Sequence, residues 1–205
     1  MKYPVKHFKS LAVALKELEP FVRNGQHLQT GKPFEKFGGM RSREILANWL
    51  VCVAVNAANK NEKLTFSSDP LGGDGIISDT ESGDTWPTEH VIVPKLREGQ
   101  TTDAETLILD AIKQKCSKGG EAYARGKTLI VFLDAGASMW KPNKVARQLP
   151  DPLHFAGVWV VGLQGVEEGQ YVYAVTHLDL SEGDTPIMLV RINETFTGWT
   201  VKRIQ

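Results

Sequence analysis

The chain has 205 residues, of which 41% are hydrophobic and 23% charged, and its basic and acidic residues are equal in number. This composition is typical of a folded domain with its own hydrophobic core and argues against extensive disorder. The two cysteines form no CxxC pair and the five histidines lack metal-ligand spacing, so neither a disulfide framework nor a zinc site is expected. We therefore expect a cytoplasmic protein with reduced cysteines.

Charge is unevenly distributed along the chain. Residues 1–60 carry ten Lys and Arg against four Asp and Glu, whereas residues 61–110 carry three against eleven. A basic segment beside an acidic one fits a phosphate-bearing partner next to a carboxylate site that needs cations, although a lopsided surface alone would look the same. The most apolar stretch, residues 45–58, is shorter than the roughly 20 residues that a membrane span needs, so no membrane association is expected.

The first part of the chain predicts two helices separated by a loop. Hydrophobic spacing predicts an amphipathic helix over residues 8–23, although Pro20 disfavours its last turn. Residues 24–39 are polar and rich in glycine and lysine, which predicts a loop or arm. A second helix is predicted from Ser42, as its cap, to about residue 59, with apolar residues over most of its circumference. We expect residues 1–40 to form an N-terminal helix and basic arm, and residues 41–205 a single domain.

The rest of the chain mixes strands and helices. Strands are predicted at residues 64–67, 74–78 and 87–93, followed by a helix that Gly119 and Gly120 end. After that helix, at residues 101–118, the expected elements are a buried strand at 128–134, a turn at 134–139, a short helix at 141–149, and strands at 155–163, 171–178, 187–192 and 199–204. This order predicts an α/β fold with a central mixed sheet flanked by helices and a C-terminal β-hairpin extension.

Two acids in the predicted hairpin carry the chemistry. Asp74 opens the second strand after a glycine-rich turn, Glu89 lies in the third, and a polar loop at residues 78–85 joins them. The side-chain period of two can bring both carboxylates to one face, where they repel unless a cation lies between them. Carboxylate oxygens suit Mg²⁺ or Mn²⁺ rather than zinc. The hairpin is therefore a candidate metal site, with Asp79 as an alternative to Asp74.

The order of helix, three strands, helix and strand, with acids on the second and third strands, resembles the PD-(D/E)xK nuclease superfamily, which has the restriction-endonuclease-like fold. The resemblance covers residues 42–165 and rests on the Asp-Gly-Ile-Ile phrase and on the gap of fifteen positions between Asp74 and Glu89. It implies that these acids bind the metal together with the backbone carbonyl of His90. The family's lysine two positions after the second acid is Val91 here, so the simplest form of the motif is incomplete.

Some members of that family carry the lysine on the following helix, which makes Lys115 a candidate for orienting the attacking water or stabilising the developing charge. Lys115 and Lys118 continue the apolar face of that helix, but they could instead complement its C-terminus. Glu44 corresponds to an acid that many relatives carry near the metal on the first core helix. Its alternative is a surface glutamate that complements the helix dipole.

These features predict a Mg²⁺- or Mn²⁺-dependent endonuclease that acts on DNA, although the sequence does not separate DNA from RNA. By analogy, it would act as a homodimer or as a partner subunit in a restriction or phage-defence system. A second hypothesis, favoured by Val91, is a catalytically inactive nuclease-fold protein that binds nucleic acid or serves as a scaffold. A third, a phosphate-binding loop at residues 72–75, lacks the usual Lys-Ser/Thr ending. The candidate phosphate-backbone contacts, which could equally be solvated surface residues, are Lys32, Lys36, Arg41, Arg43 and Lys118.

Overall fold

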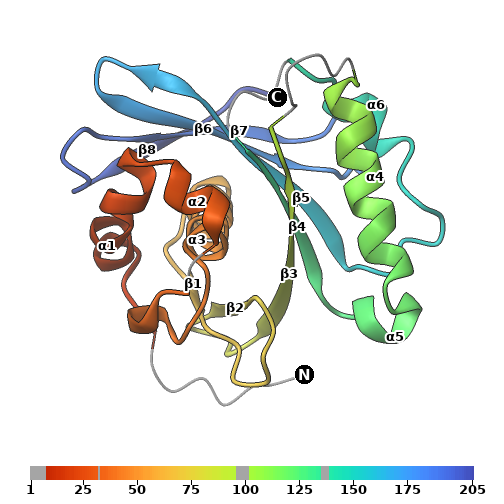
Figure 1. Ribbon diagram of the computed structural model, residues 1–205, viewed down its shortest axis with the longest axis horizontal. Coiled ribbons are helices and arrows are strands. Elements are labelled where there is room, and N and C mark those ends of the chain that lie inside the picture. The colour runs from red at the N-terminus through yellow and green to blue at the C-terminus, as the bar shows by residue number, and fades with distance from the viewer. Residues whose placement is uncertain (1–7, 32, 96–101, 135–138) are drawn as a thin grey trace.

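The computed structural model describes residues 8–31, 33–95, 102–134 and 139–205. One eight-stranded mixed sheet lies at its centre, and its strands are ordered from β1 to β8 as in the chain (Figure 1). The sheet curls around α1, α2 and α3 on its inner face, and α4, α5 and α6 cover its outer face (Figure 1). The predicted α/β class, with one central sheet flanked by helices, is therefore confirmed.

The N-terminal helices precede all strands, and the later helices connect the central ones. The helices are α1 (Leu11–Arg23), α2 (Gln26–Thr30), the 3₁₀ helix η1 (Glu35–Phe37), α3 (Ser42–Ala58), α4 (Ala104–Ser117), α5 (Gly120–Ala124) and α6 (Pro142–Ala146). The strands are β1 (Leu64–Ser67), β2 (Gly75–Asp79), β3 (Thr85–Val93), β4 (Thr128–Leu133), β5 (Gly157–Glu167), β6 (Gln170–His177), β7 (Ile187–Ile192) and β8 (Trp199–Arg203). None of the described helices combines the length and apolarity that crossing a bilayer requires.

The kind of strand pairing changes twice across the sheet. β1, β2 and β3 form an antiparallel meander, β4 and β5 continue it in parallel, and β6, β7 and β8 complete it in antiparallel pairing. Parallel neighbours need a crossover connection, and α4 with α5 provides it between β3 and β4. The start of β4 is thereby placed beside β3, and β7 with β8 forms the predicted C-terminal hairpin.

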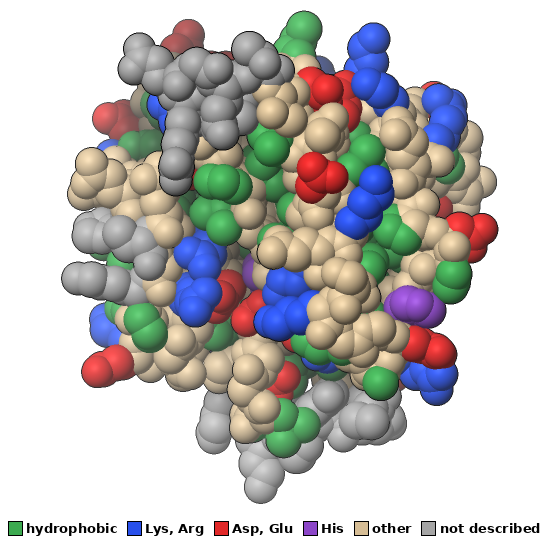
Figure 2. Space-filling view, turned by 45° about the vertical axis from the view of Figure 1, so that its right-hand side comes forward, with side chains coloured by type: hydrophobic (Ala, Val, Ile, Leu, Met, Phe, Trp, Pro, Cys, Tyr) green, Lys and Arg blue, Asp and Glu red, His purple; other side chains and the backbone are tan. Residues whose placement is uncertain are grey.

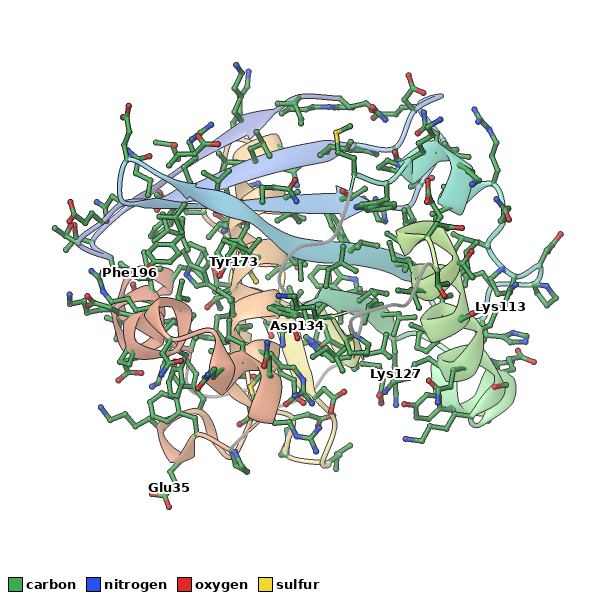
Figure 3. The ribbon with its side chains drawn as sticks, turned by 45° about the horizontal axis from the view of Figure 1, so that its top comes forward. Glu35, Lys113, Lys127, Asp134, Tyr173 and Phe196 are labelled. Atoms are coloured by element: carbon green, nitrogen blue, oxygen red, sulfur yellow. The ribbon has the colours of Figure 1, made fainter. Side chains whose placement is uncertain are left out.

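Each face of the sheet has its own hydrophobic core. Successive residues of β4 alternate between them: Ile130 packs with α1 and α3 on the inner face, and Leu129 packs with α4 on the outer face. Tyr173 and Phe196 belong to the inner core and lie on the side of the sheet that carries α1 (Figure 3). Because the sheet and α1 enclose α3, that helix is buried on nearly every side.

Three helix predictions differ in part from the structure. The helix predicted at residues 8–23 begins only at Leu11 as α1, but it ends at Arg23 as predicted: it continues through Pro20, and the N–H of Asn24 bonds to the Pro20 carbonyl at 3.2 Å. Ser42 is the first residue of α3 rather than its cap; Arg41 takes the cap position because its N–H donates to Glu44 Oε2 at 2.9 Å. The predicted loop at residues 24–39 contains α2 and η1, and α1 packs into the same core as α3.

The connection after α4 also differs from the prediction. Gly119 and Gly120 do not simply end a helix, because α5 begins at Gly120 and brings Tyr123 towards β3. β5 continues to Glu167, beyond its predicted end, because it pairs with β6 along a hairpin. Most of the predicted turn at residues 134–139 lies outside the described residues.

Leu46 tests the burial of α3, since its side chain is fully buried in the inner core. Leu46→Ala is expected to lower the free energy of unfolding by about 2–5 kcal/mol, because it removes buried apolar atoms and leaves a cavity. Urea denaturation measures this change. Val13→Ala, at a side chain on α1 that is 53% exposed, is expected to change the same quantity by less than about 0.5 kcal/mol. Equal losses in the two variants would contradict this description of the core.

Candidate active site

The pairing of β2 with β3 brings Asp74 and Glu89 together. Gly75 pairs with Thr88, so the same register places Asp74, which precedes Gly75, opposite Glu89, which follows Thr88. Asp74 Oδ2 accepts a hydrogen bond from the His90 N–H at 2.8 Å, and this bond ties Asp74 to β3. Both acids line one hollow of about 360 Å³.

The hollow lies where α3, β2, β3, α4 and α5 meet, and charged side chains dominate its lining. The acidic residues that line it are Glu44, Asp74 and Glu89, and the basic ones are Arg41, Arg43, Lys115 and Lys118. Acidic and basic side chains adjoin on the face shown in Figure 2. A larger cavity of about 540 Å³ lies between α1, α3, β1 and β8, but none of these acids lines it.

Glu89 is buried, and both of its carboxylate oxygens are bonded. Lys127 Nζ donates to Oε1 at 2.8 Å, Lys115 Nζ donates to Oε2 at 3.2 Å, and the Tyr123 hydroxyl also donates to Oε2. Burial opposes ionisation of Glu89, but the bonds from Lys127 and Tyr123 and the charge of Lys115 outweigh it and hold the pKa below its usual value. Glu89 is therefore an ionised carboxylate between two ammonium groups.

Lys127 and Tyr123 were missed in the sequence. Lys127 Nζ lies 4.4 Å from the centroid of the Tyr123 ring as well as against Glu89. Figure 3 shows Lys127 beside the sheet, on the side of α4. It directly precedes β4, whose first residue pairs with Thr88 in the parallel register. In the sequence, Lys127 could be recognised only as a lysine just before a predicted buried strand. It indicates a partner for Glu89 only when β4 is known to pair with β3, which carries Glu89.

Glu44 lies in the first turn of α3 and is 5% exposed. Its Oε2 accepts the Arg41 N–H at 2.9 Å, and its Oε1 lies 3.7 Å from Arg41 Nε. Burial raises the pKa of Glu44, and the negative charge of Asp74 adds to this effect, although Arg41 and Arg43 oppose it. A carboxyl group whose ionised form is disfavoured in this way is stabilised by an additional cation.

The predicted phosphate contacts have different surroundings. Arg43 is partly buried and forms no ion pair within the part of the chain that the structure describes; its Nη1 donates to the Gln29 carbonyl at 3.4 Å. Burial and the charge of Arg41 lower the pKa of Arg43, so an anion such as phosphate would stabilise its charge. Lys36 instead pairs with Glu17 at 3.7 Å, outside the hollow. Lys32 lies outside the described residues.

The His90 side chain turns to the opposite face from Glu89, as strand alternation predicts. Its Nε2 lies 3.2 Å from Asn48 Nδ2 in α3. Burial, with a contribution from the charge of Lys115, lowers the pKa of His90 to about 3, so the imidazole is neutral near pH 7. The predicted metal contact of His90 concerns its backbone carbonyl and stays a prediction.

The structure separates Asp79 from the hollow. Asp79 Oδ1 accepts the N–H groups of Glu81 at 2.7 Å and Ser82 at 2.9 Å, so it stabilises the β2–β3 turn at the far end of β2 from Asp74. The glycine-rich loop at residues 72–75 leads into β2 rather than into a helix, unlike a phosphate-binding loop. Asp74 is thus the hairpin acid that shares the hollow with Glu89.

The carboxylates do not form a ready-made metal centre. Across residues 8–31, 33–95, 102–134 and 139–205, no three or more His, Cys, Asp and Glu side chains gather in a metal-binding group. The oxygen ligands present fit a hard divalent cation in chemistry, but Glu89 is already bonded to two ammonium groups, whose positive charges oppose a cation there. Comparison with protein-family models, curated proteins and solved structures finds no match. Function must therefore be argued from the hollow itself.

Glu89→Gln is expected to lower the free energy of unfolding at pH 7 by roughly 1–3 kcal/mol, because it leaves two ammonium groups without their carboxylate. The folded-state pKa of Glu89 is lowered. Its contribution to stability is thus present above the unfolded pKa of about 4.3 and is lost as the pH falls through the lower folded value. Urea unfolding between pH 7 and pH 3 should therefore show wild type and variant converging at acidic pH.

The matched control is Glu121→Gln, at an exposed position on α5. It is expected to leave the pH dependence of unfolding as in wild type. A difference between wild type and Glu89→Gln that stays constant down to pH 3 would contradict the ionised, lysine-bonded state of Glu89.

Proposed function

We propose that this protein is a divalent-metal-dependent nuclease with a restriction-endonuclease-like fold, and that its substrate is DNA. The observation that carries the proposal is the facing position of Asp74 and Glu89 at one hollow, where Glu44 adds a third carboxylate. The order α3, β1, β2, β3, α4 and β4 supports it, because it is the element order of that fold's core.

Hydrolysis of a phosphodiester requires a positioned water and opposite charge where the transition state becomes more negative. A divalent ion held by Asp74 and Glu89 would supply a bound water of lowered pKa and would neutralise phosphate oxygens. Glu44 orders a further water at the N-terminus of α3. These three carboxylates line the same hollow from three separate segments of the chain rather than from one contiguous motif.

Lys115 and Lys127 together take the place of the motif lysine. Val91, at the usual position, packs against the outer-face core and offers no charge. The two ammonium groups instead reach Glu89 from α4 and from the start of β4. There they orient the attacking water or stabilise the negative charge that develops on the phosphate.

Arg41, Arg43 and Lys118 bind the phosphate backbone at the rim of the hollow. Affinity from such contacts is independent of sequence and falls steeply with salt. A homodimer, or a subunit of a restriction or phage-defence system, is the assembly in which a nuclease of this size would act, by analogy with the fold.

A second candidate function is binding of nucleic acid without cleavage. It is favoured by the state of Glu89, whose oxygens are both neutralised by the chain's own lysines. If Glu89 keeps those bonds when nucleic acid binds, the hollow is a basic docking site, and the protein acts as a scaffold or binding subunit.

Asp74→Asn separates these two functions. We expect it to reduce Mg²⁺-dependent cleavage of plasmid DNA by about 100-fold or more, because an amide is a weaker metal ligand than a carboxylate. Mn²⁺ binding, measured by calorimetry near neutral pH, should fall in parallel. Asp79→Asn, the same change in the same hairpin outside the hollow, should retain both properties.

Cleavage at the wild-type rate by Asp74→Asn would eliminate the nuclease proposal. Wild-type protein that binds DNA, but neither binds Mn²⁺ nor cleaves, would favour the binding function instead.

A further inference from the structure

Behind the hollow, on the inner face of the sheet, hydrogen bonds connect the elements that carry the three acids. Asn48 is fully buried one turn after Glu44 in α3, and its Nδ2 donates to the Glu44 carbonyl at 2.9 Å. The same Nδ2 lies 3.2 Å from His90 Nε2. The His90 N–H donates to Asp74 Oδ2, and His90 directly follows Glu89 in β3. One chain of bonds thus runs from α3 through β3 to the residue that precedes β2.

The chemistry of this chain fixes which atom donates at each step. The Glu44 carbonyl can only accept, so the Asn48 atom that faces it must be the amide nitrogen. The second hydrogen on Asn48 Nδ2 is then available for His90 Nε2, which accepts it, and the imidazole proton lies on Nδ1. The position of residue 48 thus requires one nitrogen that carries two N–H hydrogens, one for the Glu44 carbonyl and one for His90 Nε2, and the side-chain amide of Asn48 provides both.

Stability alone does not explain this arrangement. Three buried polar atoms around it, Asn48 Oδ1, His90 Nδ1 and Thr88 Oγ1, have no hydrogen-bond partner among the described residues. Buried polar groups in folded proteins are nearly always paired, so an incompletely bonded network is a poor way to join a helix to a sheet.

A second buried asparagine in the same helix provides the comparison. Asn56 lies about two turns further along α3, and it uses both amide atoms, accepting from the Leu64 N–H and donating to the Leu64 carbonyl, each at 2.9 Å. Asn56 is thus a fully bonded structural link between α3 and β1. Asn48, by contrast, leaves its oxygen unbonded while its nitrogen reaches the strand that carries Glu89.

We propose that Asn48 and His90 are positioning residues of the candidate active site. Asn48 holds the first turn of α3, with Glu44, at a fixed place relative to β3. The main-chain N–H of His90 then fixes the position of the Asp74 carboxylate, and Glu89 is held in place because it directly precedes His90 in β3. The inference rests on the proposed function for its role in catalysis, but the link itself can be measured without activity.

Amide hydrogen exchange at residue 90 measures the link, because that N–H is the donor to Asp74. Asn48→Leu removes both donors at similar volume. His90→Gln places an amide acceptor where Nε2 lies, whereas His90→Asn reaches only the position of Nδ1. We expect exchange at residue 90 to be about tenfold faster than in wild type for Asn48→Leu and His90→Asn, and close to wild type for His90→Gln.

Asn56→Leu is the matched control, since it removes a buried amide from the same helix away from the hollow. It is expected to lower the melting temperature and to leave exchange at residue 90 close to the wild-type rate. Wild-type exchange in Asn48→Leu, or equal exchange in His90→Gln and His90→Asn, would overturn the proposal. Should Asn48→Leu fail to fold, the two His90 variants decide the question.

Mn²⁺ affinity in the same variants tests the consequence for the site. It should fall about tenfold in Asn48→Leu and His90→Asn, as when a residue that orients a metal ligand is lost, and stay within about twofold of wild type in His90→Gln and Asn56→Leu. An equal fall in Asn56→Leu would show general destabilisation and overturn the positioning role. If wild type itself neither binds Mn²⁺ nor cleaves DNA, the proposed function fails, and the exchange pattern alone supports or overturns the link.

Discussion

The ionised carboxylate of Glu89, buried between two lysines, is the constraint on which the outer half of the structure depends. A buried charge is costly unless it is paired and hydrogen-bonded. Its partners come from α4, from α5 and from the residue before β4, so all three segments must meet β3 at the same point. The crossover from β3 to β4 therefore not only connects two parallel strands but also carries Lys115 and Lys127, the two cations that neutralise Glu89.

The carboxylate of Glu89 belongs both to the ion cluster that it forms with Lys115 and Lys127 and to the candidate metal site. A divalent cation and the two ammonium groups are positive charges at the same carboxylate, so under the proposed function the binding of a cation at Glu89 weakens or releases its bonds to the lysines. Phosphate oxygens are good acceptors for a released ammonium group. Binding of cation and of phosphate would then favour one another, and the cluster would be most stable when neither is present.

The parts of this arrangement that follow local rules were predictable from the sequence. Hydrophobic periodicity gave α3, α4 and the strands of the meander, and a hairpin register set over a few residues was enough to suggest that Asp74 and Glu89 share a face. Lys127 and Tyr123 were not predictable in this way, because they reach Glu89 through a parallel pairing and a five-residue helix, α5, that leave no periodic pattern. The contact of Asn48 was not predictable either, because its partner His90 lies 42 positions away in the chain.

The proposed nuclease function depends on whether Asp74 and Glu89 share one cation. Anomalous diffraction from crystals soaked in Mn²⁺ answers this most directly. The proposal predicts a peak in the hollow within coordination distance of oxygens from both carboxylates, with Glu89 no longer bonded to at least one of Lys115 and Lys127. A hollow without such a peak, with Glu89 still held by both lysines, would contradict it.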